Sequence, residues 1–273
     1  MCAVTVLHAR IDGNSRPLEA ATISVADDGL LRGDGVYEVL RVYAGSPFAV
    51  DEHLDRMSRS AAGLRLPLDV DAARHDILEL TAVAGDADAL IRLVKTRGGR
   101  RIALLESVPA FPASVSLATL PYHPTGLLDG LKTISYAANS LATRLANERT
   151  ADQALLITPQ GWVLEGPNFA AFFVFADRDT LVTPPLDEGI LDSITRRHLM
   201  ALVPAEERRI HVDEFAALRE MFVSSTIREV LPVSAIDGVT LPACPGPRTS
   251  DAQRAFAAQI HVETGTTAAP SAT

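Results

Sequence analysis

The sequence contains few of the residues that stabilise small secreted or zinc-binding domains. Two cysteines occur among its 273 residues, Cys2 and Cys244, and they lie at opposite ends of the chain without metal-type spacing. The sequence therefore indicates neither a disulfide framework nor a structural zinc site, because both need paired or clustered cysteines. With 47% hydrophobic residues, the chain is long enough to bury a full core instead.

The chain also lacks an excess of positive charge. Its 25 Lys and Arg residues against 34 Asp and Glu residues give a net charge of −9, so no broad basic field is available for nucleic acid or anionic lipid. No apolar run approaches the length that crosses a bilayer, and the first residues, MCAVTVLHARIDG, show no secretory signal pattern. We therefore expect a cytoplasmic protein that binds small soluble molecules, and neither nucleic acid nor a membrane.

Two kinds of periodicity alternate along the first part of the chain. Short stretches separated by turn residues predict antiparallel strands over about residues 1–50, with a hairpin at AGSP. Apolar spacing predicts a helix in DEHLDRMSRSAAGLRLP, with Asp51 as its N-cap, and a second helix in DAARHDILELTAVAG. The segment ALIRLVKTRGGRRIALLESVP predicts two strands joined by a Gly98-Gly99 turn. These features indicate an α+β first domain.

A proline-rich segment, VPAFPASVSLATLPYHPTG, separates this region from the rest of the chain. We place a small domain at residues 1–118, a linker at 119–125 and a larger domain at 126–273, with a disordered tail after about residue 264.

The second domain is expected to open with a strand around Lys132, followed by a helix near 137–149. A hairpin turning at Pro159-Gln160-Gly161, further strands, and an amphipathic helix after GILDSITRR complete the prediction.

Lys132 is unusual because it interrupts an apolar run, GLLDGLKTISYAANS. The ordinary explanation is a lysine whose ammonium reaches solvent at an edge of the sheet. A desolvated lysine is instead a nucleophile that forms a Schiff base with an aldehyde. Pyridoxal phosphate is the aldehyde to consider. It needs a lysine, an acid facing its ring nitrogen, a group on the ring oxygen and a cup for its phosphate.

Other segments offer candidates for these groups. Glu165, in GWVLEGPNF, lies at the end of a predicted hairpin strand and supplies an acid. The helix start in GILDSITRR offers the amides of Ile194 and Thr195 to an anion. Hydroxyl and guanidinium donors come from VSSTIREV and DEHLDRM: Ser225, Thr226 and Arg56. Taken singly, each has an ordinary explanation as a loop or surface residue.

Together, these segments resemble the fold-type IV pyridoxal phosphate enzymes, also called class IV aminotransferases. GDGVYE, EHLDR, LKT, DQALL, LEG, SITR and SST…EVLPV occur in the family's order over nearly the whole chain. The family includes D-amino acid and branched-chain transaminases, (R)-selective amine transaminases and aminodeoxychorismate lyase. The resemblance implies a two-domain, D-amino acid aminotransferase-like α+β fold. Its small N-terminal domain would be α/β, and its larger C-terminal domain would have a β-barrel-like core.

The resemblance also implies roles for individual residues. Lys132 would hold pyridoxal phosphate as a Schiff base and carry a proton during the reaction. Glu165 would pair with the ring nitrogen, and Tyr136 would contact the ring oxygen. The phosphate would be shared by Arg56, Ile194, Thr195, Ser225 and Thr226. No metal is implied. The enzyme would be a homodimer, with each active site completed by a loop from the other subunit.

Residues near the same motifs bear on the substrate. Tyr37 and Arg32, in RGDGVYEV, and Arg97, in VKTRGG, are candidate substrate-binding residues, because the paired hydrogen bonds of an arginine suit a carboxylate. Arg100 and Arg101 are expected only to solvate the hairpin turn. We therefore favour transamination between an amino acid and a 2-oxo acid, with a D-amino acid first and a branched-chain L-amino acid second.

Three alternatives stay open from the sequence. Aminodeoxychorismate lyase would use the same lysine but eliminate pyruvate, and an (R)-selective amine transaminase would act on a simple amine. The third is a non-catalytic protein that binds phosphate or a vitamin. The side of the pocket that receives the substrate carboxylate differs among members of the family, and the sequence does not show it.

Overall fold

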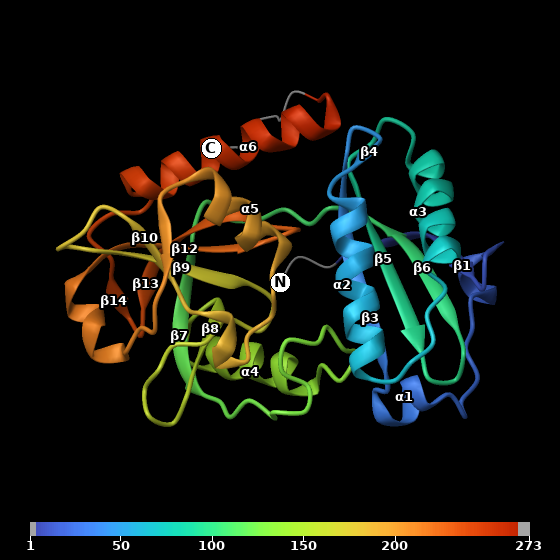
Figure 1. Cartoon of the computed structure of the whole chain (residues 1–273), viewed down its shortest axis with the longest axis horizontal. Coiled ribbons are helices and arrows are strands. Elements are labelled where there is room, and N and C mark those ends of the chain that lie inside the picture. Colours follow the sequence, from blue (N-terminus) through green and yellow to red (C-terminus); the bar gives the residue numbers. More distant parts are fainter. Residues whose placement is uncertain (1–3, 267–273) are drawn as a thin grey trace. The chain divides into compact units, whose positions relative to one another are not determined.

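The structure is a computed structural model that describes residues 4–266, and it divides into two compact units. Among the described residues, unit 1 contains residues 4–110, 131–136 and 260–266, and unit 2 contains residues 111–130 and 137–259 (Figure 1). The segment expected to be a linker includes the end of strand β7 (Val115–Pro121), which belongs to unit 2. Most of the tail expected after residue 264 lies outside the described residues.

Unit 1 is a six-stranded antiparallel sheet with two long helices on one face (Figure 1). The strand order is β2-β1-β6-β5-β3-β4, so the predicted Gly98-Gly99 hairpin joins the two central strands. The strands are β1 (Val6–Ile11), β2 (Asn14–Arg16), β3 (Gly35–Tyr43), β4 (Ser46–Pro47), β5 (Ala89–Thr96) and β6 (Arg101–Glu106). The helices are η1 (Leu18–Ala20), α1 (Asp28–Arg32), α2 (Val50–Gly63) and α3 (Val70–Ala84).

The apolar spacing that predicted α2 and α3 is confirmed by the core of unit 1. One face of each helix packs on alternate residues of β3, β5 and β6, and these side chains form a single buried cluster. The prediction of Asp51 as the N-cap of α2 is wrong. Ala49 holds this position in a left-handed conformation (φ 54°), and its N–H donates to the Glu263 carboxylate (2.6 Å). The helix begins early because the chain turns sharply after β4, which places Asp51 in the first helical turn.

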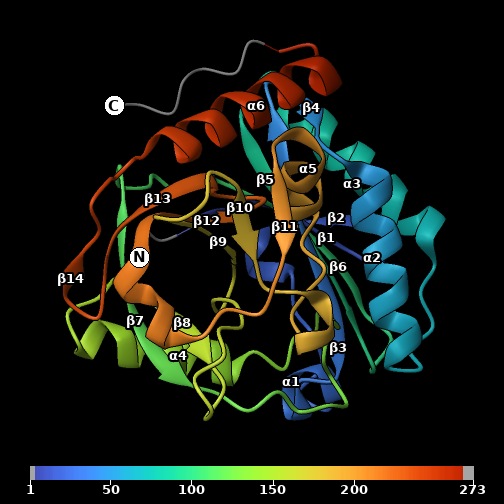
Figure 2. The same cartoon turned by 60° about the vertical axis from the view of Figure 1, so that its left-hand side comes forward.

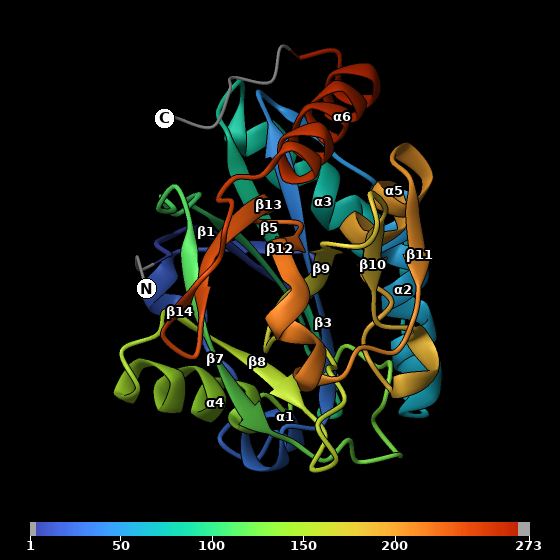
Figure 3. The same ribbon diagram turned by 90° about the vertical axis from the view of Figure 1, so that its left-hand side faces the viewer.

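Unit 2 is built on a larger sheet in the strand order β11-β10-β9-β12-β13-β7-β8, with β14 on β13 (Figure 2). Besides β7, its strands are β8 (Gln153–Ile157), β9 (Ala170–Phe175), β10 (Leu181–Thr183), β11 (Ala205–Glu207), β12 (Leu218–Ser225), β13 (Glu229–Ile236) and β14 (Val239–Thr240). Its helices are α4 (Ala137–Glu148), η2 (Leu186–Glu188), α5 (Ile194–Leu202), η3 (Val212–Ala217) and most of α6 (Pro247–Thr264). Helix α4 lies along β7 and β8 (Figure 3).

Backbone hydrogen bonds outside the named strands close this sheet on itself. After the predicted turn at Pro159-Gln160-Gly161, Leu164 donates its N–H to Leu156 of β8 (2.9 Å). Val163 donates to the carbonyl of Ile210 (2.8 Å), which follows β11 at the other edge of the sheet. The result is a barrel-like core filled by apolar side chains from most strands of unit 2. Among residues 4–266, no helix has the length and apolar character needed to cross a lipid bilayer.

A buried carboxylate ties helix α3 to the sheet of unit 1. Asp76 is fully buried and accepts hydrogen bonds from Arg10 of β1 (2.9 Å) and Arg101 of β6 (2.6 Å). The expectation that Arg101 only solvates the hairpin turn is therefore wrong, because the residue begins β6 and its side chain reaches Asp76 of α3. Arg100, by contrast, is exposed and pairs with Asp12. Removing the Asp76 carboxylate would leave two desolvated guanidinium groups without this counter-charge.

We predict that Asp76→Asn lowers the free energy of unfolding by about 3–5 kcal/mol, the usual effect of breaking a buried ion pair. The matched control is Asp51→Asn, which breaks an exposed ion pair with Arg74 in the same unit and should cost less than about 1 kcal/mol. Urea unfolding at neutral pH measures both. Equal losses in the two variants would show that the buried carboxylate adds no special stability.

Candidate active site

Lys132 lies in an extended segment along the edge of β3. The expectation that it occupies a regular strand is wrong. Residues 131–134 make only an isolated bridge with the start of β3, from Thr133 to Val36, and β4 pairs with the end of β3. Tyr37 donates its N–H to the carbonyl of Lys132 (3.2 Å), and Ile134 donates to the carbonyl of Gly35 (3.0 Å). The carbonyl side of Lys132 is thereby fixed to the sheet.

The other side of the same segment contacts helix α2. Lys132 donates its N–H to the hydroxyl of Ser60 (3.0 Å), which is buried. Position 35 requires glycine, because a Cβ there would lie 2.5 Å from the carbonyl oxygen of Lys95 on the neighbouring strand β5. The same Cβ would lie 2.8 Å from the side chain of Ile134, so glycine also leaves room for the Lys132 segment. The main chain of Lys132 is therefore held from both the sheet and the helix.

Two tyrosines lie near the side chain of Lys132. Its Nζ is 4.3 Å from the centroid of the Tyr37 ring. The ring of Tyr136 packs edge-on against Tyr37, with centroids 5.8 Å apart. The half-buried Lys132 amine thus lies over an aromatic face, and both tyrosines predicted from the sequence belong to the same group.

Arg92 joins this group, although sequence reasoning did not predict it. Its guanidinium carbon is 6.0 Å from the Tyr37 ring centroid, and its Nε donates to Glu106 (2.7 Å). Burial alone lowers the pKa of Arg92, but the Glu106 carboxylate outweighs burial and raises the pKa above its ordinary value. Strand register would have revealed the residue: Tyr37 pairs with Val94, two positions from Arg92 on the same face of β5.

Arg56 lies on the opposite face of the sheet, in a buried cluster with Glu38 and His53. Its Nε and Nη2 donate to the two carboxylate oxygens of Glu38 (2.6 and 2.8 Å). His53 Nδ1 lies 2.8 Å from Glu38 Oε2. The sequence contained a signal for this cluster, since His53 and Arg56 are three residues apart on one helix face.

The cluster shifts the pKa values of both of its titrating members downward. Burial alone would raise the pKa of Glu38, but the charge of Arg56 and the hydrogen bonds from Arg56 and His53 hold it well below its ordinary value. Burial lowers the pKa of His53, and the charges of Arg56 and Lys132 act in the same direction against the Glu38 hydrogen bond. Near neutral pH, a neutral imidazole therefore donates from Nδ1 to an ionised carboxylate.

The two arginines predicted to bind substrate have partners within unit 1. Arg32 is exposed and pairs with Asp28 at the start of its own short helix. Arg97 donates from Nε to Asp34 (3.0 Å) and from Nη2 to the carbonyl of Leu64 (2.6 Å). Arg97 thus links the β5–β6 hairpin to the end of α2.

Glu165 lies in unit 2, where the chain returns from the hairpin that follows β8. Its carbonyl accepts the N–H of Leu156 (2.8 Å), and its half-buried carboxylate accepts the N–H of Leu191 (3.0 Å). The next residue must be glycine, because a Cβ at Gly166 would overlap the ring of Phe169. This tight turn fixes the direction of the Glu165 side chain.

The start of helix α5 and the β12–β13 turn supply donors for an anion in unit 2. Ser193 caps α5, so Ile194 and Thr195 occupy its first turn, where backbone N–H groups have no partner within the helix. The helix dipole adds to their affinity for a negative charge. Ser225 is the last residue of β12, a strand that α5 contacts, and Thr226 begins the turn that follows; both are half-buried. Amide and hydroxyl donors of this kind suit a phosphate.

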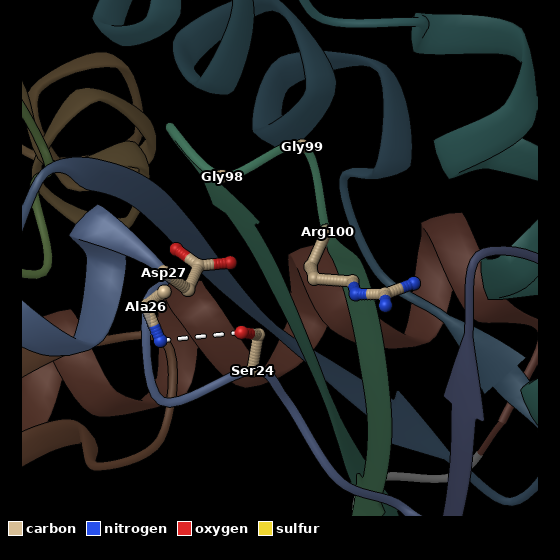
Figure 4. Close-up of a pocket in the computed structure, with 6 residues that line it drawn as sticks. All are labelled: Ser24, Ala26, Asp27, Gly98, Gly99 and Arg100. Atoms are coloured by element: carbon tan, nitrogen blue, oxygen red, sulfur yellow. Dashed lines mark hydrogen bonds between the residues drawn. The ribbon is translucent and has the colours of Figure 1, made fainter.

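A cavity of about 280 Å³ in unit 1 is lined by none of the predicted site residues. Its buried carboxylate, Asp27, accepts hydrogen bonds from the N–H of Gly29 (2.7 Å) and the hydroxyl of Thr96 (2.8 Å). Asp27 therefore holds the ends of α1 and β5 together. The lining residues, drawn in Figure 4, are Ser24, Ala26, Asp27, Gly98, Gly99 and Arg100.

We predict that Glu38→Gln lowers the free energy of unfolding by about 3–5 kcal/mol at pH 7, because it leaves the Arg56 charge buried without its counter-ion. The stability that Glu38 contributes is present above its unfolded pKa of about 4.5 and is lost as the pH falls further. His53 adds a further loss of stability that begins as the pH falls below about 6.5. The pKa of His53 is lower in the folded protein, so the unfolded chain binds a proton at this imidazole more readily.

Urea unfolding between pH 7 and pH 3.5 measures this dependence. The slope below pH 4.5 should be shallower in Glu38→Gln than in the natural protein. Asp55→Asn, at an exposed position of the same helix, is the control and should keep the natural slope. A natural slope in Glu38→Gln as well would contradict the prediction.

Comparison with known proteins identifies the family. The sequence model for class IV aminotransferases matches residues 35–236. A putative branched-chain-amino-acid aminotransferase of Methanocaldococcus jannaschii is 33% identical over an alignment of 245 positions, which covers 80% of this chain and 84% of that protein. A D-alanine aminotransferase of Bacillus licheniformis is 31% identical over an alignment of 281 positions including gaps, which covers 93% of this chain and 98% of that protein. The solved structure of a fold IV transaminase from Curtobacterium pusillum aligns with a TM-score of 0.79 at 28% identity, covering 89% of this chain and 92% of that one.

The residues described above fit pyridoxal phosphate, the cofactor of this family. Unit 1 contains a lysine amine, that of Lys132, and unit 2 contains a carboxylate, that of Glu165, which are kinds of group that this cofactor requires. The first turn of α5 and the hydroxyls of the β12–β13 turn offer donors for its phosphate. The chain therefore belongs to the class IV aminotransferase family of fold-type IV enzymes, which depend on pyridoxal phosphate.

Proposed function

We propose that this enzyme transfers an amino group between an amino acid and a 2-oxo acid, and that Lys132 forms the Schiff base with the cofactor. The observation that carries the proposal is the setting of Lys132, whose main chain is fixed on two sides while its amine lies over Tyr37. A fixed backbone with a half-buried amine suits a covalent nucleophile. Pyridoxal phosphate, when bound, supplies the aldehyde and an electron-withdrawing ring.

The other residues have proposed roles that follow from their chemistry. The Lys132 amine, once released by the substrate, would carry a proton from the substrate Cα to the C4′ carbon of the cofactor. Glu165 would keep the ring nitrogen protonated, and Tyr136 would donate to the ring oxygen. Phosphate donors would be Arg56, Ile194, Thr195, Ser225 and Thr226. The bidentate bond to Glu38 orients Arg56 before any phosphate binds.

For the substrate, we propose a D-amino acid first and a branched-chain L-amino acid second. The D-alanine aminotransferase relative supports the first choice because the similarity spans nearly the full length of both chains. The putative branched-chain-amino-acid aminotransferase of Methanocaldococcus jannaschii supports the branched-chain L-amino acid, with a slightly higher sequence identity over a shorter alignment. Tyr37, Arg32 and Arg97 are the proposed substrate-side residues. To bind a substrate carboxylate, each arginine would exchange its present partner, Asp28 or Asp34, for that group. We propose a homodimer on the strength of the family resemblance, and a cytoplasmic location as the sequence predicts.

Lys132→Ala should abolish the covalent attachment of the cofactor and lower kcat by about 10²–10⁴-fold, the usual contribution of a positioned proton-transfer group. The attachment is measured by borohydride reduction followed by peptide mass spectrometry. The matched control is Lys95→Ala, because Lys95 is the other lysine of the chain and its Nζ binds only the carbonyl of Gly99 among the described contacts. A cofactor adduct on Lys95, or full turnover by Lys132→Ala, would contradict the assignment.

Amino donors added singly should distinguish the substrate classes. D-Alanine, D-glutamate, L-leucine and (R)-1-phenylethylamine are each mixed with the enzyme without an acceptor, and the loss of the cofactor's visible absorption is timed. We expect D-alanine or D-glutamate to react fastest, followed by L-leucine, with the simple amine slowest because it lacks a carboxylate. A preference for L-leucine of more than about tenfold, roughly 1.4 kcal/mol, would reverse the order. Release of pyruvate from aminodeoxychorismate without an acceptor would instead support the lyase.

A further inference from the structure

Helix α2 presents a row of buried polar side chains, His53, Arg56 and Ser60. Their spacing of three and four residues places them on one helix face, and each is at most 5% exposed. Buried polar groups are costly unless they are hydrogen-bonded. His53 and Arg56 both bind Glu38. Ser60, at the end of the row, binds the main chain of Lys132 instead.

The hydrogen bond to Ser60 helps to fix the main chain of Lys132. The carbonyl of Lys132 is bound by Tyr37 of β3, and its N–H is bound by Ser60 of α2. Glycine at position 63 of the same helix leaves room for the segment, because a Cβ there would lie 2.8 Å from the side chain of Leu131, which would have to shift. Residues 131–134 have no continuous strand ladder along their length. The orientation of Lys132 therefore depends on these few contacts.

We propose that Ser60 is a positioning residue for Lys132. Its hydroxyl accepts the Lys132 N–H, which sets the direction in which the lysine side chain leaves the backbone and hence the place of Nζ over Tyr37. The inference rests on the proposed role of Lys132. Ser60 acts through the Lys132 backbone, and a displacement of about 1 Å at a reacting group lowers a rate by about 10²-fold.

A merely structural role for Ser60 gives a different expectation. Any buried hydroxyl that satisfies a backbone N–H stabilises the fold when present. Its loss would lower the melting temperature but would leave a bound cofactor in its natural orientation. Measurements of the cofactor environment therefore separate the two roles: the visible circular dichroism of the bound cofactor, the pH profile of its absorption, and the division of effects between kcat and KM.

The test compares Ser60→Ala and Ser60→Cys with the natural protein, each as the full chain loaded with pyridoxal phosphate. We expect Ser60→Ala to lower kcat by about 10- to 100-fold with little change in KM, and to alter the circular dichroism and pH profile of the cofactor. The kcat and cofactor spectra of Ser60→Cys should lie between those of Ser60→Ala and the natural protein, because sulfur is a weaker hydrogen-bond acceptor than a hydroxyl oxygen. The control is Ser107→Ala, which removes a hydroxyl that accepts the N–H of Thr5 (2.9 Å) in the same unit. It should change only the melting temperature.

Unchanged cofactor dichroism, an unchanged pH profile and kcat within about twofold of the natural value in Ser60→Ala would overturn the inference. If the alanine variant does not fold, the same unchanged readouts in Ser60→Cys overturn it. Failure of the proposed function has a separate signature, which is a natural protein that yields no borohydride-stable adduct at Lys132. The two ideas can therefore fail independently.

Discussion

The close fit of residues 131–134 between the edge of β3 and helix α2 is the constraint on which the candidate site depends. Glycine at positions 35 and 63 leaves room for this segment, because a Cβ would lie 2.8 Å from the Ile134 side chain at position 35 and 2.8 Å from the Leu131 side chain at position 63. Hydrogen bonds to Tyr37 and Ser60 then hold the approaching segment at Lys132. A lysine is among the most flexible side chains, so fixing its backbone is the most direct way for a fold to limit where its amine can reach.

Two buried carboxylates make this fit rigid. Asp76 binds α3 to β1 and β6, and Glu38 binds β3 to α2 through Arg56 and His53. Neither helix can slide on the sheet without breaking ion pairs in a desolvated interior, where an unpaired charge is costly. Helix α2 consequently holds Ser60 in a fixed position beside the main chain of Lys132. The polar row on α2 therefore links the stability of unit 1 to the geometry of the candidate site.

Much of the fold could be predicted from the sequence, because it depends on local patterns. Apolar spacing located α2 and α3, and the paired glycines located the β5–β6 turn. Features set by distant contacts were missed. The start of α2 depends on the turn after β4 and on Glu263, and the irregular pairing of Lys132 depends on β4 occupying the same edge of the sheet. Sequence motifs likewise named the candidate lysine but not its partner Ser60, because a hydroxyl that accepts a backbone N–H leaves no distinctive pattern.

The difference between cofactor and substrate residues has a physical cause. All members of the family need the same groups around the same cofactor, so those residues fall in short motifs that can be read in order. The surroundings of Tyr37 are set instead by register across three strands, which brings Arg92 of β5 and Glu106 of β6 onto its face of the sheet. Substitutions at such positions change the charge near Tyr37 while leaving every motif intact. Under the proposed function, such substitutions would let relatives with the same motifs prefer different amino donors.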